Sequence, residues 1–198
     1  MAYHRKTGRD GEGYMDPTAE QALKNLERSR RGAINKRQGE AFEQTIEASL
    51  IYYKNSGVAE IEKTPEPMKP VSRADSKGRF LAVFTKPAQP DFKGTLAGGR
   101  SVVFEAKYTI ADQIDQKVVS KDQSDRLENH HRLGAVAFVL VGLGVDGFYR
   151  VPWETWRDMK SIYGRKHMKK ADLFPFKVRY VGGVLRFLDT TERGGCCE

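Results

Sequence analysis

The chain has 198 residues, of which 39% are hydrophobic and 30% are charged, and this length predicts one domain with room for a small appendage. No apolar run is long enough to span a bilayer, and the first residues lack the apolar stretch of a secretory signal, so we expect no membrane partner. The net charge of +8 and the pI of about 9.4 favour a polyanionic partner, although a soluble protein that is merely basic has the same composition.

The first part of the chain is interpreted as an arm followed by a helix. Residues 1–32 are polar, basic and dotted with glycine, so we expect a flexible arm that either contacts phosphates or is simply disordered. Asp16-Pro17 is a start signal for one short helix inside this arm. The first long helix is expected to begin at Asn35, to carry an apolar face as far as Tyr53, and to end at residues 55–57.

A strand is expected over residues 58–63, and a long basic segment follows it over residues 64–90. Five prolines interrupt this segment, and an apolar stretch at 79–84 predicts a strand in its middle. A segment of this length in a compact domain is either functional or disordered. We expect a projecting stalk whose cations neutralise phosphates and whose aromatic rings stack or wedge in nucleic acid. The alternative is an edge hairpin whose phenylalanines pack on the core.

The candidate chemistry lies on the hairpin that comes next. Asp91 precedes a turn region with Gly98-Gly99, and residues 102–107 form a β-branched and aromatic run that ends in alternation. Glu105 and Lys107 leave this strand on the same face, and the hairpin can bring Asp91 beside them. Two carboxylates and a lysine on adjacent strands can hold a divalent metal and orient a water, which suits Mg²⁺. The alternative is an ordinary surface ion pair after an ordinary turn aspartate.

The second half of the chain alternates helices and strands. We expect a polar link over residues 108–119, a helix over 120–133, a buried central strand over 134–141 and its hairpin partner over 147–151. A short helix over 152–156, a basic solvated loop over 165–170 and a closing hairpin over 178–188 are expected after them. This order predicts the α/β class, with a mixed β-sheet flanked by helices. The adjacent Cys196 and Cys197 cannot staple such a fold and fit a reducing cytoplasm, and we have no functional interpretation for them.

Several short motifs occur in a fixed order along roughly residues 33–190. They are Asn35-x-x-x-Gly39-x-x-Phe42-Glu43, Lys63-Thr64-Pro65, Asp91-x-x-Gly94, Phe104-Glu105-Ala106-Lys107, Asp122-Gln123, Gly134-x-x-x-Phe138 and Tyr149-x-Val151-Pro152. In this order and spacing the chain resembles the RecU family of Holliday-junction resolvases, from bacteria and their phages. The resemblance implies a restriction-endonuclease-like fold over residues 33–190, with a protruding basic stalk at about 64–90, after an arm at 1–32 and before a tail at 191–198.

The resemblance also implies roles for individual residues. Asp91, Glu105 and the backbone carbonyl of Ala106 would be metal ligands, and Lys107 would orient or activate the attacking water. The catalytic set is completed by Glu43, which would join the acidic cluster, and by Gln123, which would help to place the water or the metal. Without the resemblance, these last two are ordinary exposed helix residues.

The candidate DNA contacts are basic and aromatic residues on or near the expected stalk and first helix: Lys63, Lys69, Arg73, Lys77, Arg79, Phe80 and Arg37. The opening Asn35-Lys36-Arg37 departs from the usual Asn-Arg-Gly of the family, and Tyr108 stands where a further acid is usual. The stalk sequence is also barely recognisable. These departures bear on the substrate contacts more than on the chemistry.

Members of the family act as homodimers with Mg²⁺, or Mn²⁺ as a substitute, and cut two opposed strands of a four-way junction. The resemblance therefore implies branched DNA, a second copy of the chain, and recombinase or branch-migration proteins as partners. The expected location is the cytoplasm, in association with the nucleoid, of a bacterial cell or a phage-infected host. The alternatives are a nuclease of the same fold that acts on other branched or duplex DNA, and a DNA-binding recombination factor that does not cut.

Overall fold

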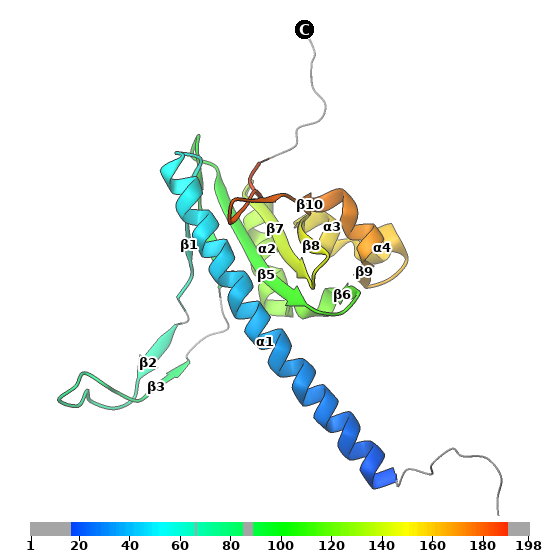
Figure 1. Ribbon diagram of the computed structural model, residues 1–198. Coiled ribbons are helices and arrows are strands. Elements are labelled where there is room, and N and C mark those ends of the chain that lie inside the picture. Colours follow the sequence, from blue (N-terminus) through cyan, green and yellow to red (C-terminus); the bar gives the residue numbers. More distant parts are fainter. Residues whose placement is uncertain (1–16, 66, 85–88, 190–198) are drawn as a thin grey trace, which may run out of the picture.

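A mixed β-sheet forms the centre of the molecule (Figure 1). The computed structural model describes residues 17–65, 67–84 and 89–189, and within these ranges the central sheet has six strands. Their order across the sheet is β1 (Ala59–Lys63), β4 (Phe92–Leu96), β5 (Ser101–Thr109), β7 (Val136–Leu143), β8 (Gly147–Pro152) and β10 (Lys177–Val178). β5 and β7 are parallel, whereas the other neighbours are antiparallel. The prediction of a mixed sheet flanked by helices is therefore confirmed.

Helices cover both faces of this sheet. Helix α2 (Lys121–Arg132) makes the crossover that the parallel pair β5 and β7 requires, and its buried Leu127 packs with α3 (Trp153–Arg157) against one face. Helix α1 (Pro17–Asn55) covers the other face, where three phenylalanines from neighbouring strands stack on one another. Their ring centroids are 4.8 Å apart for Phe92 and Phe104 and 4.7 Å apart for Phe104 and Phe138. The buried apolar residues of the strands are thus divided between two separate cores.

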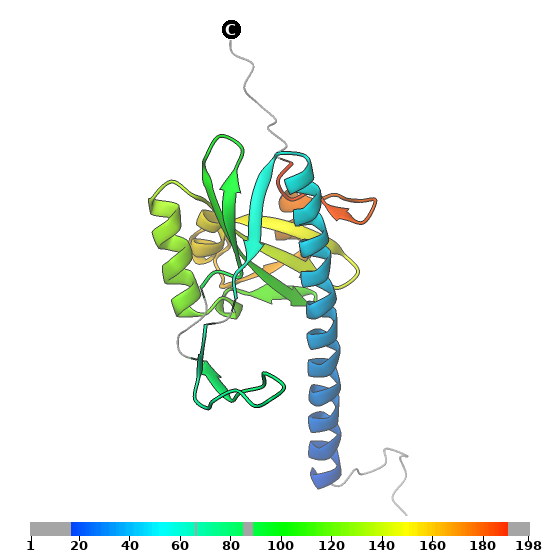
Figure 2. The ribbon, with the colours of Figure 1, turned by 90° about the vertical axis from the view of Figure 1, so that its left-hand side faces the viewer.

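Helix α1 is longer than predicted. Its second half packs on the sheet through Phe42, Ile46, Leu50 and Tyr53, while its first half extends away from the sheet and is exposed (Figures 1 and 2). The helix begins at Pro17 as predicted, but residues 17–32 continue directly into the long helix and do not form a separate short one, and residues 1–16 lie outside the described ranges. The stretch is rich in strong helix formers, so the absence of an apolar face did not mean the absence of a helix. No helix in the described ranges, α1 included, is long and apolar enough to cross a membrane.

The hairpin of β4 and β5 has the predicted alternation. Val103 belongs to the core under α2, whereas Phe104 belongs to the core under α1. Gly98 and Gly99 form the turn with φ angles of 90° and 87°, which favour glycine. Gly94 has a different role, because a Cβ built there would lie 2.0 Å from the carbonyl oxygen of Glu60 on β1. A side chain at position 94 would therefore separate β4 from β1.

The expected stalk is a two-stranded hairpin that projects from the body of the molecule (Figures 1 and 2). Its strands are β2 (Met68–Pro70) and β3 (Ala82–Phe84), which pair antiparallel, so the predicted strand over 79–84 is shorter than expected. Residues 66 and 85–88 lie outside the described ranges. Phe80 is 53% exposed, and the alternative in which it packs on the core is therefore wrong.

Two segments that were expected to be irregular form a small second sheet. β6 (Gln113–Asp115) lies in the predicted polar link, and β9 (His167–Lys169) lies in the predicted basic loop. They pair antiparallel, and the opposed Ile114 and Met168 are both buried. Strands of three residues with one apolar side chain show no periodicity, which is why the sequence did not reveal them.

The remaining helices and strands are short. They are η1 (Gln116–Val118), α4 (Met159–Tyr163), α5 (Lys170–Leu173), η2 (Phe174–Phe176), β11 (Tyr180–Val181) and β12 (Val184–Leu185). β11 and β12 form the predicted closing hairpin, while the preceding β10 joins the central sheet beside β8. After β12, Phe187 is buried and packs against Tyr53 of α1 with ring centroids 5.2 Å apart. The end of the described chain is thus attached to the first helix.

Candidate active site

The structure brings Asp91, Glu105 and Lys107 together. Asp91 immediately precedes β4, and the pairing of Phe92 with Phe104 sets it beside Glu105 on the neighbouring strand β5. The Lys107 Nζ lies 3.0 Å from Glu105 Oε2 and 3.6 Å from Asp91 Oδ2. The backbone N–H of Ala106 donates to Asp91 Oδ2 at 3.0 Å, so the aspartate is fixed to the strand that carries the other two groups.

Glu105 is fully buried, which is unusual for a carboxyl group. Its Oε2 accepts hydrogen bonds from Lys107 and from Gln123, but its buried Oε1 has no hydrogen-bond partner in the described part of the chain. Burial, together with the negative charge of Asp91, raises the pKa of Glu105 to about 8, and the nearby Lys107 opposes this rise. This raised pKa favours the protonated form of Glu105 when no cation neutralises the pair.

Gln123 is held at both ends of its side chain. Its Nε2 donates to Glu105 Oε2 at 2.6 Å, and its Oε1 accepts from the Ser120 backbone N–H at 3.0 Å. The Ser120 side chain in turn accepts from the Gln123 backbone N–H, so the two residues form a capping box at the start of α2. The predicted Gln123 thus lies at the acidic pair. Ser120, whose backbone N–H holds the Gln123 side chain, was missed, although the spacing Ser-x-x-Gln is the sequence signal for this motif.

Glu43 does not join this cluster in the structure. Its Oε2 accepts from Lys63 Nζ at 2.7 Å, and Glu47 is the second acid near the same lysine, at 3.2 Å. Within the described residues, no group of three or more Asp, Glu, His or Cys residues could hold a metal ion. The expected third acid is therefore turned toward β1 and the base of the stalk. Lys63 ends β1, and the next N–H, that of Thr64, donates to the Asp91 carbonyl at 2.8 Å.

A divalent cation fits the donor set of Asp91 and Glu105. Burial and the negative charge of Asp91 raise the pKa of the Glu105 carboxyl, and a shared proton or a cation removes the repulsion between the two carboxylates. The buried Oε1 of Glu105, which has no hydrogen-bond partner among the described residues, is a candidate ligand atom. Carboxylate oxygens are the ligands that Mg²⁺ prefers, and it retains waters for the rest of its shell.

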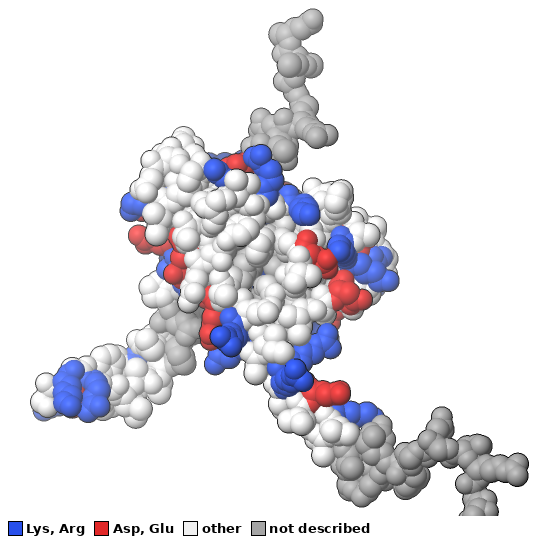
Figure 3. All heavy atoms as spheres, viewed as in Figure 1, with Lys and Arg blue, Asp and Glu red and all other residues white. Residues whose placement is uncertain are grey.

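The predicted DNA contacts of the stalk are exposed. Lys and Arg side chains gather at the far end of the stalk (Figure 3), and the exposed residues there and in the strands include Lys69, Arg73, Lys77, Arg79 and Phe80. Arg79 is paired with Asp75 at 2.8 Å, and Asp75 also accepts from the backbone N–H groups of Lys77 and Arg79. These bonds fix the shape of the tip. Arg37 is exposed on α1.

The end of β5 is tied to α1 by contacts that sequence reasoning missed. The Tyr108 hydroxyl donates to Gln38 Oε1, and the Ile110 backbone N–H donates to Asn35 Oδ1 at 3.1 Å. The ring of Tyr108 occupies the space over Gly142, where a Cβ would lie 2.5 Å from it. Tyr108, which departs from the family pattern, therefore has a structural role between the helix and the sheet.

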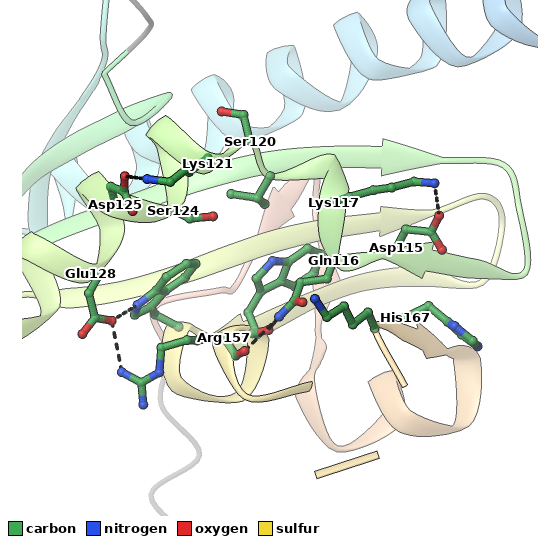
Figure 4. A pocket seen from close by; sticks show the side chains of 14 residues that line it. Asp115, Gln116, Lys117, Ser120, Lys121, Ser124, Asp125, Glu128, Arg157 and His167 are labelled. Atoms are coloured by element: carbon green, nitrogen blue, oxygen red, sulfur yellow. Dashed lines mark hydrogen bonds and ion pairs between the residues drawn. The ribbon is translucent and has the colours of Figure 1, made fainter. Parts of the chain in front are cut away.

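A pocket of about 730 Å³ lies beside α2, between that helix, α3 and the small sheet of β6 and β9 (Figure 4). None of Asp91, Glu105 and Lys107 lines it. Its charged groups are mostly satisfied by one another, as in the ion pairs Lys121–Asp125, Arg157–Glu128 and Lys117–Asp115. The N–H of Trp153 also donates to Glu128 Oε2 at 2.7 Å. This pocket is therefore separate from the acidic site.

Comparison with known proteins assigns the chain to a family. The sequence model described as "Recombination protein U" matches residues 37–189. The chain belongs to the RecU family. RecU proteins are Holliday-junction resolvases, and the match spans the sheet, the stalk and the Asp91–Glu105–Lys107 group. The resemblance inferred from the motifs is confirmed, and with it the expected fold class.

Among solved structures, this RecU chain is similar to Hjc, a Holliday junction resolvase from the archaeal hyperthermophile Archaeoglobus fulgidus. The two share 18% sequence identity with a TM-score of 0.37, and the match covers 60% of this chain and 75% of that chain. No curated protein matches the chain. The family assignment rests on the sequence match over residues 37–189.

Proposed function

We propose that this RecU chain resolves four-way DNA junctions by metal-dependent hydrolysis at Asp91, Glu105, Lys107 and Gln123. The observation that carries the proposal is the placement of a buried Glu105, with one unpartnered oxygen, between Asp91 and Lys107 on adjacent strands. A buried acid of this kind is costly unless it binds a cation or keeps a proton. A junction-resolving nuclease uses that arrangement, whereas a DNA-binding factor that does not cut has no need of it.

Each residue of the group has a distinct role in the proposed reaction. Asp91 and Glu105 would hold Mg²⁺, with the Ala106 carbonyl as a further proposed ligand, and the ion would supply positive charge to the phosphate in the transition state. Mn²⁺ is the expected substitute. Lys107 Nζ orients the attacking water and offsets charge on the phosphate oxygens. Gln123 fixes the Glu105 carboxyl in one rotamer through its bond to Oε2. The water adds to phosphorus, and the P–O bond to the 3′ oxygen breaks.

Glu43 is assigned a different role, since it pairs with Lys63 rather than with Asp91. This ion pair sits where β1 leads into the stalk, and the Thr64 N–H bond to the Asp91 carbonyl links the same place to the acidic pair. The stalk base and the active site are therefore built on neighbouring residues. We propose that Glu43 and Lys63 hold the stalk in its direction relative to the site.

Recognition of a junction depends on shape, because no base sequence defines a junction. The proposed form is a two-fold homodimer, whose paired sites would face two opposed strands. The exposed stalk would enter the junction centre, with Lys69, Arg73 and Lys77 on phosphates and Phe80 against bases, and Arg37 would contact an arm. The proposed location is the nucleoid of a bacterial cell or of a phage-infected host, with recombinase or branch-migration proteins as partners.

The test compares a labelled mobile four-way junction with a linear duplex of the same sequence, in Mg²⁺ and in EDTA. We expect paired, symmetric nicks in the junction alone and only with the metal. Equal cutting of the duplex would instead assign the chain to a nuclease that acts on other DNA. Tight junction binding without any cutting in Mg²⁺ or Mn²⁺ would overturn the catalytic proposal and leave a DNA-binding recombination factor.

A further inference from the structure

A second pocket, of about 450 Å³, lies at the other end of the central strands from Lys107. β5 and β7 run parallel, and the pocket is built around their first residues, with Arg100 just before β5 and Ala135 just before β7. Its volume is within the range of sites that bind small ligands or peptide ends. Most of the wall is apolar: Val58, Leu96, Ala97, Ala135, Val136, Ala137, Pro152 and Leu188.

Arg150 lines this pocket without a hydrogen-bonding partner in the described part of the chain. Its Nε is buried and donates to no acceptor, and its Cζ lies 4.7 Å above the ring of Phe138. Burial lowers the pKa of Arg150 from its usual value, and the charge of Arg100 acts in the same direction. A shielded guanidinium is costly without an anion, and a contact with one aromatic face offsets only part of that cost.

The other ionisable groups of the pocket offset this charge only in part, because burial and Arg100 lower the pKa of Arg150 while Glu154 raises it. Arg100 uses its Nε on the Gly134 carbonyl at 2.8 Å, and it is not ion-paired within the described residues. Glu154 is the single acid that lines the pocket in the described ranges, and it lies 3.6 Å from His131. Two arginines therefore face a mostly apolar cavity, in contrast to the pocket beside α2, where most charges are paired.

The apolar lining of the pocket limits the kind of anion that can bind to the two arginines. The phosphates of duplex DNA are on a convex, hydrated surface, and they have no apolar group to place against eight apolar residues. A carboxylate that carries an apolar side chain matches both parts, because guanidinium groups bind carboxylates through paired hydrogen bonds. We propose that this pocket binds the C-terminal carboxylate of a partner protein whose last residue is apolar, with Arg100 and Arg150 on the carboxylate.

The test uses the full chain and fluorescein-labelled acidic peptides that end in Leu, Ile, Phe or Val, measured by fluorescence anisotropy. Each peptide is compared as the free acid and as the C-terminal amide. We expect the acids to bind, and we expect each amide to bind at least about tenfold more weakly than the corresponding acid. Equal binding of acid and amide, or no binding by any of the four acids, would overturn the proposal.

Variants separate this pocket from the rest of the surface. Arg100→Gln and Arg150→Gln should each weaken peptide binding about tenfold or more. Arg179→Gln, at an exposed arginine that is paired with Asp189, is the matched control and should leave peptide binding unchanged.

Arg100→Gln keeps the proposal testable if Arg150→Gln folds poorly. Junction cutting should persist in Arg100→Gln, so failure here is distinguishable from failure of the nuclease proposal. If a short linear duplex competes with the peptide for the native protein, and this competition is lost in Arg100→Gln, the pocket binds DNA and the peptide proposal is overturned.

Discussion

Gln123 Nε2 and Glu105 Oε2 lie 2.6 Å apart, and this bond connects the start of α2 to the buried acid of β5. It explains why a glutamine lies at the third position of that helix, where it also caps the Ser120 N–H. The same side chain thus stabilises the helix and sets the orientation of a proposed metal ligand. Local helix chemistry and the active site are coupled at one residue.

This coupling predicts that Gln123→Ala impairs cutting more than stability. Loss of the bond to Glu105 leaves that carboxyl free to change rotamer, so we expect single-turnover cleavage of the junction to fall about tenfold to a hundredfold. Ser120→Ala is the matched control, because it removes the side-chain cap, at a cost of about 1 kcal/mol, and leaves the Gln123 bond to Glu105 in place. Equal losses of cleavage rate in both variants would show that Gln123 acts only through the helix.

Lys107 is predicted to act on the reaction and not on DNA affinity. Lys107→Met keeps the apolar stem but removes the ammonium group beside Asp91 and Glu105, and we expect cleavage to fall about a hundredfold or more with junction binding unchanged. Lys121→Met, at an exposed lysine whose ion pair in the described ranges is with Asp125, should leave both properties as they are. A Lys107→Met protein that loses junction binding in proportion to activity would contradict the assigned role.

The stability of the metal-free protein should fall as the pH rises. The pKa of Glu105 is raised from 4.5 to about 8 in the folded protein, so between these values the folded protein holds one more proton than the unfolded chain. The free energy of unfolding then falls by up to about 1.4 kcal/mol per pH unit, and this loss is absent below pH 4.5, where both states are protonated.

Glu105→Gln tests this relationship, because glutamine resembles the protonated acid. In EDTA we expect the Tm of the variant to exceed that of the native protein more at about pH 8 than at about pH 5. A difference in Tm that does not change with pH would show that Glu105 is ionised throughout.

Metal binding is predicted to oppose the loss of stability that the metal-free protein shows as the pH rises. Mg²⁺ binds the ionised form of Glu105, so its addition should release a proton and raise the Tm of the native protein. Glu105→Gln lacks the charged ligand and should show little or no rise at the same Mg²⁺ concentration. Thermal unfolding measures this without any DNA or activity. An equal rise in both proteins would place the ion elsewhere.

The stalk is predicted to contribute affinity for junctions. Arg73→Gln with Lys77→Gln removes two exposed cations near its tip, and we expect weaker junction binding with a shallower dependence on salt, by about one unit of slope per charge. Lys160→Gln, an exposed lysine on α4, is the control on the body of the molecule. Junction binding that is the same in the stalk double variant and in Lys160→Gln would remove the stalk from the recognition surface.

Strong local signals made the catalytic hairpin predictable. The alternation of Val103, Phe104 and Glu105 and the turn at Gly98-Gly99 placed two carboxylates and a lysine together, as the structure has them. The position of Glu43 could not be predicted in this way, because its partner Lys63 is twenty residues away and the ion pair depends on the tertiary angle between α1 and β1. Short paired strands such as β6 and β9, and a solvent-exposed helix such as the first half of α1, leave no periodic apolar pattern to read.

Junction cleavage and junction binding by Asp91→Asn, measured in the same titration, decide whether the acidic pair is the active site. The substitution keeps the size of the side chain, and it removes one of the two carboxylates that the structure places together at this site. We expect cutting to fall about a hundredfold to a thousandfold in Mg²⁺ while the affinity for the four-way junction stays the same. Cutting at the native rate in Asp91→Asn would contradict the assignment of the active site.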